Sequence, residues 1–316
     1  MPAAQAIYDP DLDDLAQRFA RLAVSDPDAA LQTWHQETRG LSTEIGRTAG
    51  RLADQALNWQ GRARLSQQRQ GAALLMIWHA DQYRRPVMPK LPLLSKRLTF
   101  QYCASLVRQR GNDSAISAMA RGQMVLVGLR RETCTLVNRG LGAYDDYIAV
   151  LNGPSGQGAV RTFPAATEPS AQYAHRASPL STGKRLDPAY DQVRFRKIEG
   201  DDVNGDGIRD AGRLKAGTYF YNERPGGYMK DRAFQTSKNQ TAERDTNGDG
   251  FFTSADTNRI DTKFVGTSML IHKGGNLANG NTGSAGCQTI PSDCYASFLA
   301  AVGRNPRFHY VLIDGY

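Results

Sequence analysis

The spacing of apolar residues changes near Gly122. Before this glycine, apolar residues recur every three or four positions, as on one face of a helix: Leu12, Leu15, Phe19 and Leu22. After it they form short runs typical of strands: 124–129, 134–137, 147–151, 160–163, 212–221 and 308–313. A chain of 316 residues is long enough to bury two modest cores. The change therefore predicts an α+β protein with a helical module at 1–121 and a β-rich domain at 122–316.

Turn and cap signals divide the helical module into several helices. Asp26-Pro27 is typical of a helix start, because the aspartate can cap free amides and the proline fits the first turn. Further helical patterns cover about 63–84 and 95–110. The segment between them is predicted to be an extended linker because prolines punctuate it: Pro86, Pro89 and Pro92. We interpret this module as a targeting, delivery or capping element for the second domain.

Charge and composition narrow the classes of partner. The net charge of +8 and the isoelectric point near 9.4 indicate an anionic partner. The basic residues are scattered and form no known nucleic-acid-binding pattern, so no nucleic-acid partner is expected and the bacterial wall ranks first. No apolar run approaches the roughly 18 residues of a membrane span, so no transmembrane segment is expected. No signal peptide is visible either, so a wall enzyme of this sequence would be exported by another route or would have lost its leader.

The stretch 268–288 holds the residues most suggestive of chemistry. An apolar run, predicted to be a buried strand, ends at His272, and Cys287 follows Gly286 after a loop rich in glycine and asparagine. A thiol becomes a nucleophile near neutral pH when an imidazole lies beside it, and a nearby amide can stabilise an oxyanion. Four cysteines in a chain of this length do not form a disulfide framework. Either residue alone is more often structural, and only the joint pattern favours a cysteine nucleophile.

His272 and the run Ser284-Ala-Gly-Cys287 resemble the catalytic signature of the L,D-transpeptidase (YkuD-type) family. Ala285 stands where that family usually has a second histidine. The resemblance implies an L,D-transpeptidase-like catalytic domain in which Cys287 attacks a peptidoglycan stem peptide and His272 acts as the base. It also implies that amides around Gly286 and Cys287 form the oxyanion hole, with Ser284 part of the same catalytic signature.

Two loops rich in Asp, Asn and Gly interrupt the β-rich domain and match calcium-binding patterns. In the loop 245–256 the candidate ligands are Asp245, Asn247, Asp249, the Phe251 carbonyl, Thr253 and Asp256. The loop 202–210 matches the front of the same pattern with Asp202, Asn204, Asp206, the Ile208 carbonyl and Asp210. Calcium in either loop is predicted to be structural, because a hard cation does not activate a thiolate. Turns of Asx and Gly without a metal are the alternative interpretation.

Together these patterns predict a peptidoglycan-processing cysteine enzyme with a Cys–His dyad and an acyl-enzyme intermediate. With water as acceptor it is an L,D-carboxypeptidase or endopeptidase, and with an amine it is an L,D-transpeptidase. We expect it to act in the periplasm or cell wall as an exported antibacterial effector or a phage-type lytic protein. Peptidoglycan stem peptides are the expected substrate, with a cognate inhibitor or secretion machinery as further partners. The alternative is a calcium-binding, wall-binding or structural module in which Cys287 is merely buried.

Overall fold

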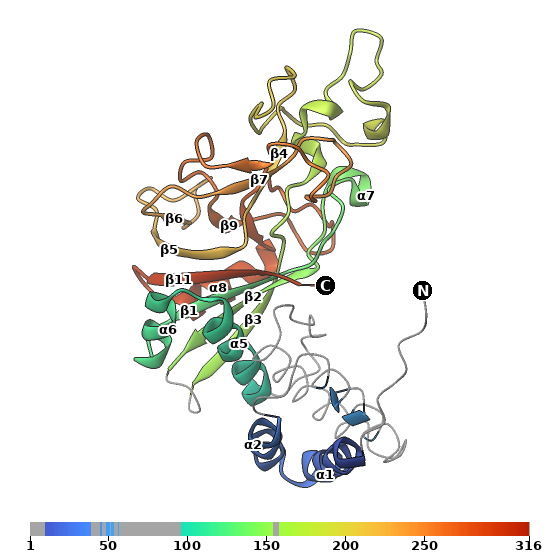
Figure 1. The fold of residues 1–316 in the computed structure, drawn as a ribbon. Helices are drawn as coiled ribbons and strands as arrows, with labels where there is room; N and C mark the ends of the chain where they lie inside the picture. The colour runs from blue at the N-terminus through green and yellow to red at the C-terminus, as the bar shows by residue number, and fades with distance from the viewer. Residues whose placement is uncertain are drawn as a thin grey trace. The chain divides into compact units, whose positions relative to one another are not determined.

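The computed structural model describes residues 10–38, 45, 49–50, 52–53, 56, 96–153 and 158–315. It contains both helices and a large mixed β-sheet, which confirms the α+β class (Figure 1). The chain divides into two compact units, 1–109 and 110–316. This division precedes the boundary expected at 121–122, because helix α6 (Asp113–Ala120) packs on strands of the second unit. The helix predicted at about 63–84 and the proline linker after it lie outside the described residues.

In the first unit the described helices are α1 (Pro10–Ser25), α2 (Pro27–Glu37) and α5 (Lys96–Arg110), which ends at the division. The ring of Phe19 in α1 lies 4.7 Å from the ring of Trp34 in α2, and both side chains are buried. Asp26 accepts a hydrogen bond from the Ala29 amide at 3.1 Å, so the predicted helix cap is confirmed. Among the helices that the structure describes, none combines the length and the apolar character that a membrane span requires.

The second unit is built on an eight-stranded sheet with the order β10-β9-β6-β5-β11-β1-β2-β3. Its strands are β1 (Val125–Arg130), β2 (Asp146–Asn152), β3 (Ala159–Ala165), β5 (Gly217–Glu223), β6 (Phe234–Thr236), β9 (Ile271–Lys273), β10 (Gln288–Ile290) and β11 (Arg307–Asp314). The pairs β1–β11 and β9–β10 are parallel, and the other neighbours are antiparallel. A backbone bridge joins Ala166, just after β3, to Thr289 in β10, so the two edges of the sheet meet.

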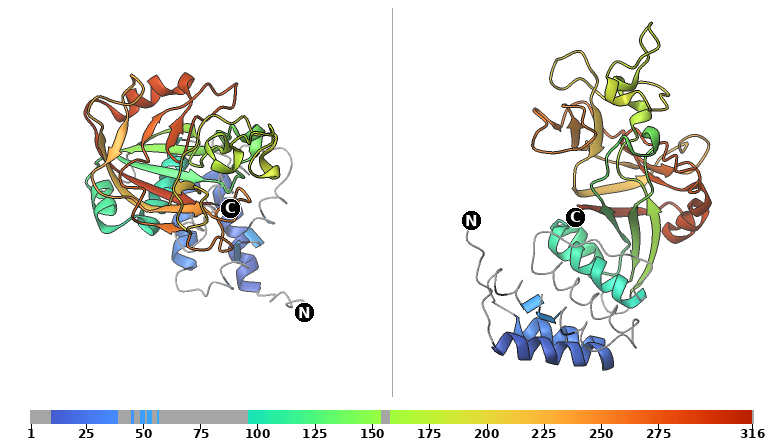
Figure 2. Two further views of the ribbon diagram at one scale, coloured as in Figure 1. Left: turned by 90° about the horizontal axis from the view of Figure 1, so that it is seen from above. Right: turned by 90° about the vertical axis from the view of Figure 1, so that its right-hand side faces the viewer.

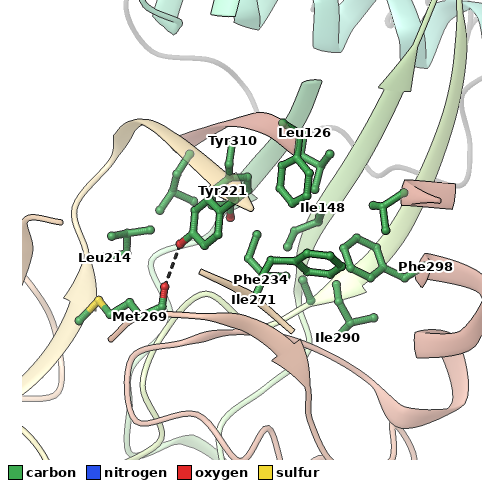
Figure 3. Packing of buried hydrophobic residues seen from close by; sticks show 14 of the residues in the cluster. Leu126, Ile148, Leu214, Tyr221, Phe234, Met269, Ile271, Ile290, Phe298 and Tyr310 are labelled. Carbon is green, nitrogen blue, oxygen red and sulfur yellow. Dashed lines mark hydrogen bonds between the residues drawn. The ribbon is translucent and has the colours of Figure 1, made fainter. Parts of the chain in front are cut away.

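The curled sheet encloses the core of this unit, and helix α8 (Ser292–Val302) contributes to it (Figure 2). Figure 3 shows how rings and aliphatic side chains from distant strands meet there. Core residues include Leu126, Ile148, Tyr221, Phe234, Ile271, Ile290, Phe298 and Tyr310. Burial of this apolar surface fixes which face of β9 and β10 points inward.

A second, three-stranded sheet has the order β4-β7-β8 and consists of β4 (Ala211–Leu214), β7 (Ala242–Asp245) and β8 (Ile260–Asp261). The single strand predicted at 212–221 is therefore wrong: β4 belongs to the small sheet and β5 to the large one. Short 3₁₀ turns lie in the long segment between β3 and β4: Ala171–Tyr173, His175–Ala177 and Pro188–Tyr190.

The strand predicted at 134–137 is also wrong. This segment forms a turn into the short helix α7 (Val137–Gly140), where Asn138 and Arg139 both have positive φ. The Thr135 amide donates to the Gly250 carbonyl at 2.9 Å instead of to a neighbouring strand. The Thr135 amide is thus hydrogen-bonded to the loop 245–256 and not to a neighbouring strand of a sheet.

Candidate active site

His272 and Cys287 are brought together by the parallel pairing of β9 and β10. In this pairing Ile271 lies opposite Gln288, and His272 lies opposite Thr289. Successive side chains of a strand point to opposite faces, so His272 points away from the face on which Ile271 enters the core. Cys287 directly precedes Gln288 and shares the face of His272. The predicted nucleophile and the predicted base therefore lie on one side of adjacent strands.

Both residues line one pocket of about 350 Å³. Besides the loop 272–287, two other segments contribute walls: the segment 173–199 and the turn 228–231. They supply side chains that sequence reasoning did not single out: Tyr173, Arg196, Lys197, Glu199, Tyr228, Met229 and Asp231. These residues carry no motif of their own, and only the fold brings them to the dyad.

The imidazole of His272 is buried and held in one orientation. Its Nδ1 lies 2.7 Å from the Lys273 carbonyl oxygen, and the centroids of the Tyr228 and His272 rings are 4.7 Å apart. A carbonyl oxygen can only accept, so Nδ1 carries the proton and Nε2 keeps the lone pair. Burial lowers the pKa of His272 below its ordinary 6.5, and the hydrogen bond to the Lys273 carbonyl opposes this shift. The ring is therefore neutral at pH 7. A neutral imidazole with a free lone pair can act as a base.

The thiol of Cys287 is half-buried and contacts the backbone just before β9. Its sulfur accepts from the Leu270 amide at 3.4 Å and donates to the Ser268 carbonyl at 3.6 Å. Burial raises the pKa of Cys287 to about 11; the Leu270 amide opposes this shift and the charge of Glu199 adds to it. Within the described chain no hydrogen bond joins the sulfur to His272. The resting site therefore holds a neutral thiol and a neutral imidazole that line the same pocket, rather than an ion pair.

Ser284 and Gly286 shape the turn that presents the thiol. The Ser284 hydroxyl donates to the Cys287 carbonyl at 2.7 Å and accepts from the Gly286 amide at 3.1 Å. Gly286 has φ of 129°, and a Cβ there would lie 2.5 Å from the Gly212 carbonyl oxygen, so only glycine fits. The Gly286 amide is thus already engaged by Ser284. The Cys287 amide makes no hydrogen bond to other described residues and is the remaining oxyanion donor of the predicted pair.

The loop 245–256 is closed by its own hydrogen bonds. Asp245 accepts from the amides of Gly248 at 2.8 Å and Gly250 at 3.0 Å. Asp256 accepts through both oxygens from three backbone amides: Thr246, Asn247 and Thr253. Asp249 and the Thr253 hydroxyl likewise cap amides within the loop. Nowhere in the described chain do three or more His, Cys, Asp or Glu side chains already form a metal-binding group, so calcium in this loop stays a prediction.

Comparisons with protein-family models, with curated proteins and with solved structures find no match for this chain. The chemistry of the site therefore has to be inferred from its own residues.

Proposed function

We propose that the second unit is an L,D-transpeptidase-like catalytic domain that cleaves or exchanges stem-peptide amide bonds of peptidoglycan. The observation that carries this proposal is the placement of His272 and Cys287 on one face of two parallel strands, inside one pocket. The helical module is proposed to target, deliver or cap this domain. The site of action is the periplasm or cell wall, where stem peptides are found.

The first chemical step follows from the neutral state of both side chains. As the Cys287 sulfur attacks the amide carbonyl carbon, its proton passes to the free nitrogen of His272. The carbonyl oxygen takes up the negative charge and accepts a hydrogen bond from the Cys287 amide. The C–N bond then breaks, the imidazolium gives its proton to the leaving amine, and a thioester remains on Cys287. Water or an amine next attacks the thioester with His272 again as base, which gives hydrolysis or transpeptidation.

The pocket walls suit a peptide that carries charges of both signs. Lys273 pairs with Asp231 at 2.5 Å, and Lys197 pairs with Glu199. Arg196 donates to the Tyr173 hydroxyl at 2.9 Å and adds a further cation. Stem peptides offer carboxylates to such cations and amino groups to such carboxylates. These contacts support a peptide substrate more than an apolar ligand.

The decisive experiment is mass spectrometry of muropeptides after incubation with the full-length protein. We expect wild type to release or join stem-peptide fragments, and Cys287→Ala and His272→Ala to lose at least 99% of that activity. Cys294→Ala, a half-buried cysteine on α8 away from the pocket, is the matched control and should retain activity. Unchanged turnover in Cys287→Ala would exclude the enzyme as proposed. Binding to wall fragments without any new product would instead favour a wall-binding module.

A further inference from the structure

The loop 202–210 gathers side-chain oxygens around its own backbone. Asp202 accepts from the amides of Gly205 at 2.7 Å and Gly207 at 3.0 Å, and Asp206 accepts from the Ile208 amide at 2.8 Å. The same kind of bond forms in ordinary turns without a ligand. These bonds alone therefore do not distinguish a binding loop from an ordinary turn.

Asp210 is the feature of this loop that an ordinary turn does not explain. Its side chain is 1% exposed, and its Oδ1 has no hydrogen-bond partner in the described chain. Its Oδ2 accepts only from the Val203 amide, at 3.4 Å, so the carboxylate faces the loop. The charges of Asp206 and Asp202 act on this carboxylate, and that of Arg176 opposes them. A buried carboxylate with an unpartnered oxygen beside two other carboxylates is costly unless a cation lies between them.

We propose that this loop binds one calcium ion, independently of the proposed catalytic function. The ligands are the side-chain oxygens of Asp202, Asn204, Asp206 and Asp210 and the carbonyl oxygen of Ile208. Hard oxygen ligands on an irregular loop suit calcium better than magnesium, which requires near-ideal octahedral geometry. Because the described acidic side chains are not yet gathered at metal-binding distance, the ion draws them inward as it binds.

The proposed ion site is joined directly to one wall of the pocket. The Arg209 amide donates to His175 Nδ1 at 3.0 Å, and the Arg209 Nε donates to the Gly200 carbonyl at 2.7 Å. The adjacent Glu199 amide donates to the Tyr173 carbonyl at 2.9 Å, and both of these residues line the pocket. Calcium in the loop therefore stiffens the wall that carries the pocket's charged side chains.

The test is a calcium titration by calorimetry on the metal-free full-length protein, with thermal melts in calcium and in EGTA. Wild type should bind calcium, and its melting temperature should rise by about 5–10 °C at a hundredfold excess over Kd. Asp210→Asn should lose one bound equivalent or bind it at least tenfold more weakly. In EGTA this variant should melt no lower than wild type, because it removes an unpaired buried charge. Asp191→Asn, an exposed aspartate outside the loop, is the matched control.

Two further variants keep the test decisive. Asp245→Asn removes a predicted calcium ligand from the loop 245–256. If Asp245→Asn keeps the calcium ion that Asp210→Asn loses, that ion is assigned to the loop 202–210. Asp206 is exposed, so Asp206→Asn replaces Asp210→Asn in the titration if Asp210→Asn does not fold. Wild type that binds no calcium at millimolar concentration, or unchanged affinity in both Asp210→Asn and Asp206→Asn, would overturn the proposal. The titration is repeated in Cys287→Ala, where calcium binding should persist whether or not the protein is an enzyme.

Discussion

The alkylation rate of Cys287 should depend on pH in a way that separates a neutral thiol from a thiolate–imidazolium pair. Burial, reinforced by the charge of Glu199, raises the pKa of this thiol from 9.0 to about 11. Only the thiolate reacts, and each pKa unit changes its fraction tenfold. At pH 8 the thiolate fraction is then about 10⁻³, against about 10⁻¹ for an ordinary thiol. Cys287 should therefore react with iodoacetamide about a hundredfold more slowly than a free cysteine derivative in the same tube.

The assay is timed iodoacetamide labelling between pH 7 and 10.5, with each cysteine quantified separately by peptide mass spectrometry. The Cys287 rate should keep rising about tenfold per pH unit across this range. Glu199→Gln should increase the rate, because it removes a negative charge that opposes the thiolate. His272→Ala should leave the rate nearly unchanged. A rate that levels off below pH 8, or that collapses in His272→Ala, would show a preformed ion pair and refute this reasoning.

Four further predictions follow from individual contacts. Turnover should rise with pH along a limb centred below the ordinary imidazole pKa of 6.5, because burial lowers the pKa of His272 and only the neutral ring is a base; a rising limb centred above pH 6.5 would contradict this. Tyr221→Phe should cost about 1–2 kcal/mol in urea unfolding, since its hydroxyl donates to the buried Met269 carbonyl at 2.9 Å. Gly286→Ala should cost about 2–4 kcal/mol, measured in the same way, because a Cβ there meets a backbone carbonyl at positive φ. Arg213→Met should cost about 3–5 kcal/mol in thermal or urea unfolding, because it leaves its glutamate partners without their cation; a loss below 1 kcal/mol would show that the network is dispensable.

The strands whose apolar runs have clear ends were predictable from the sequence. The runs at 124–129, 147–151, 160–163 and 308–313 correspond to β1, β2, β3 and β11. The run 212–221 was wrongly predicted to be one strand, because its apolar pattern continues through the point where the chain passes from the small sheet to the large one. At that point the Lys215 amide donates a hydrogen bond to the carbonyl of Thr241, a residue distant in sequence. Local pattern fixes where a strand can form, whereas non-local pairing decides which sheet it joins.

The candidate site was predictable in part. The sequence indicates His272 and Cys287 as a pair, but their common face depends on the parallel register of β9 and β10, which no spacing rule supplies. It also could not indicate that Ser284 occupies the Gly286 amide, since that bond depends on the turn geometry. The raised pKa of Cys287 depends on its burial, so it too required the folded chain.

The position of the sulfur depends on the backbone before β9 as much as on the histidine. The Cys287 sulfur makes its two hydrogen bonds in the described chain to the residues that flank Met269, namely Ser268 and Leu270. The Met269 amide donates to the Gln240 side chain at 2.9 Å, and the Met269 carbonyl accepts from Gln240 at 2.8 Å. The same carbonyl accepts from the Tyr221 hydroxyl at 2.9 Å (Figure 3). Gln240, Tyr221 and Met269 are all buried, so removing one of these side chains leaves a hydrogen-bonding partner unsatisfied and shifts the backbone at the start of β9. Since these side chains lie outside the pocket, a Tyr221→Phe variant that lowers turnover without changing substrate affinity would report displacement of the sulfur.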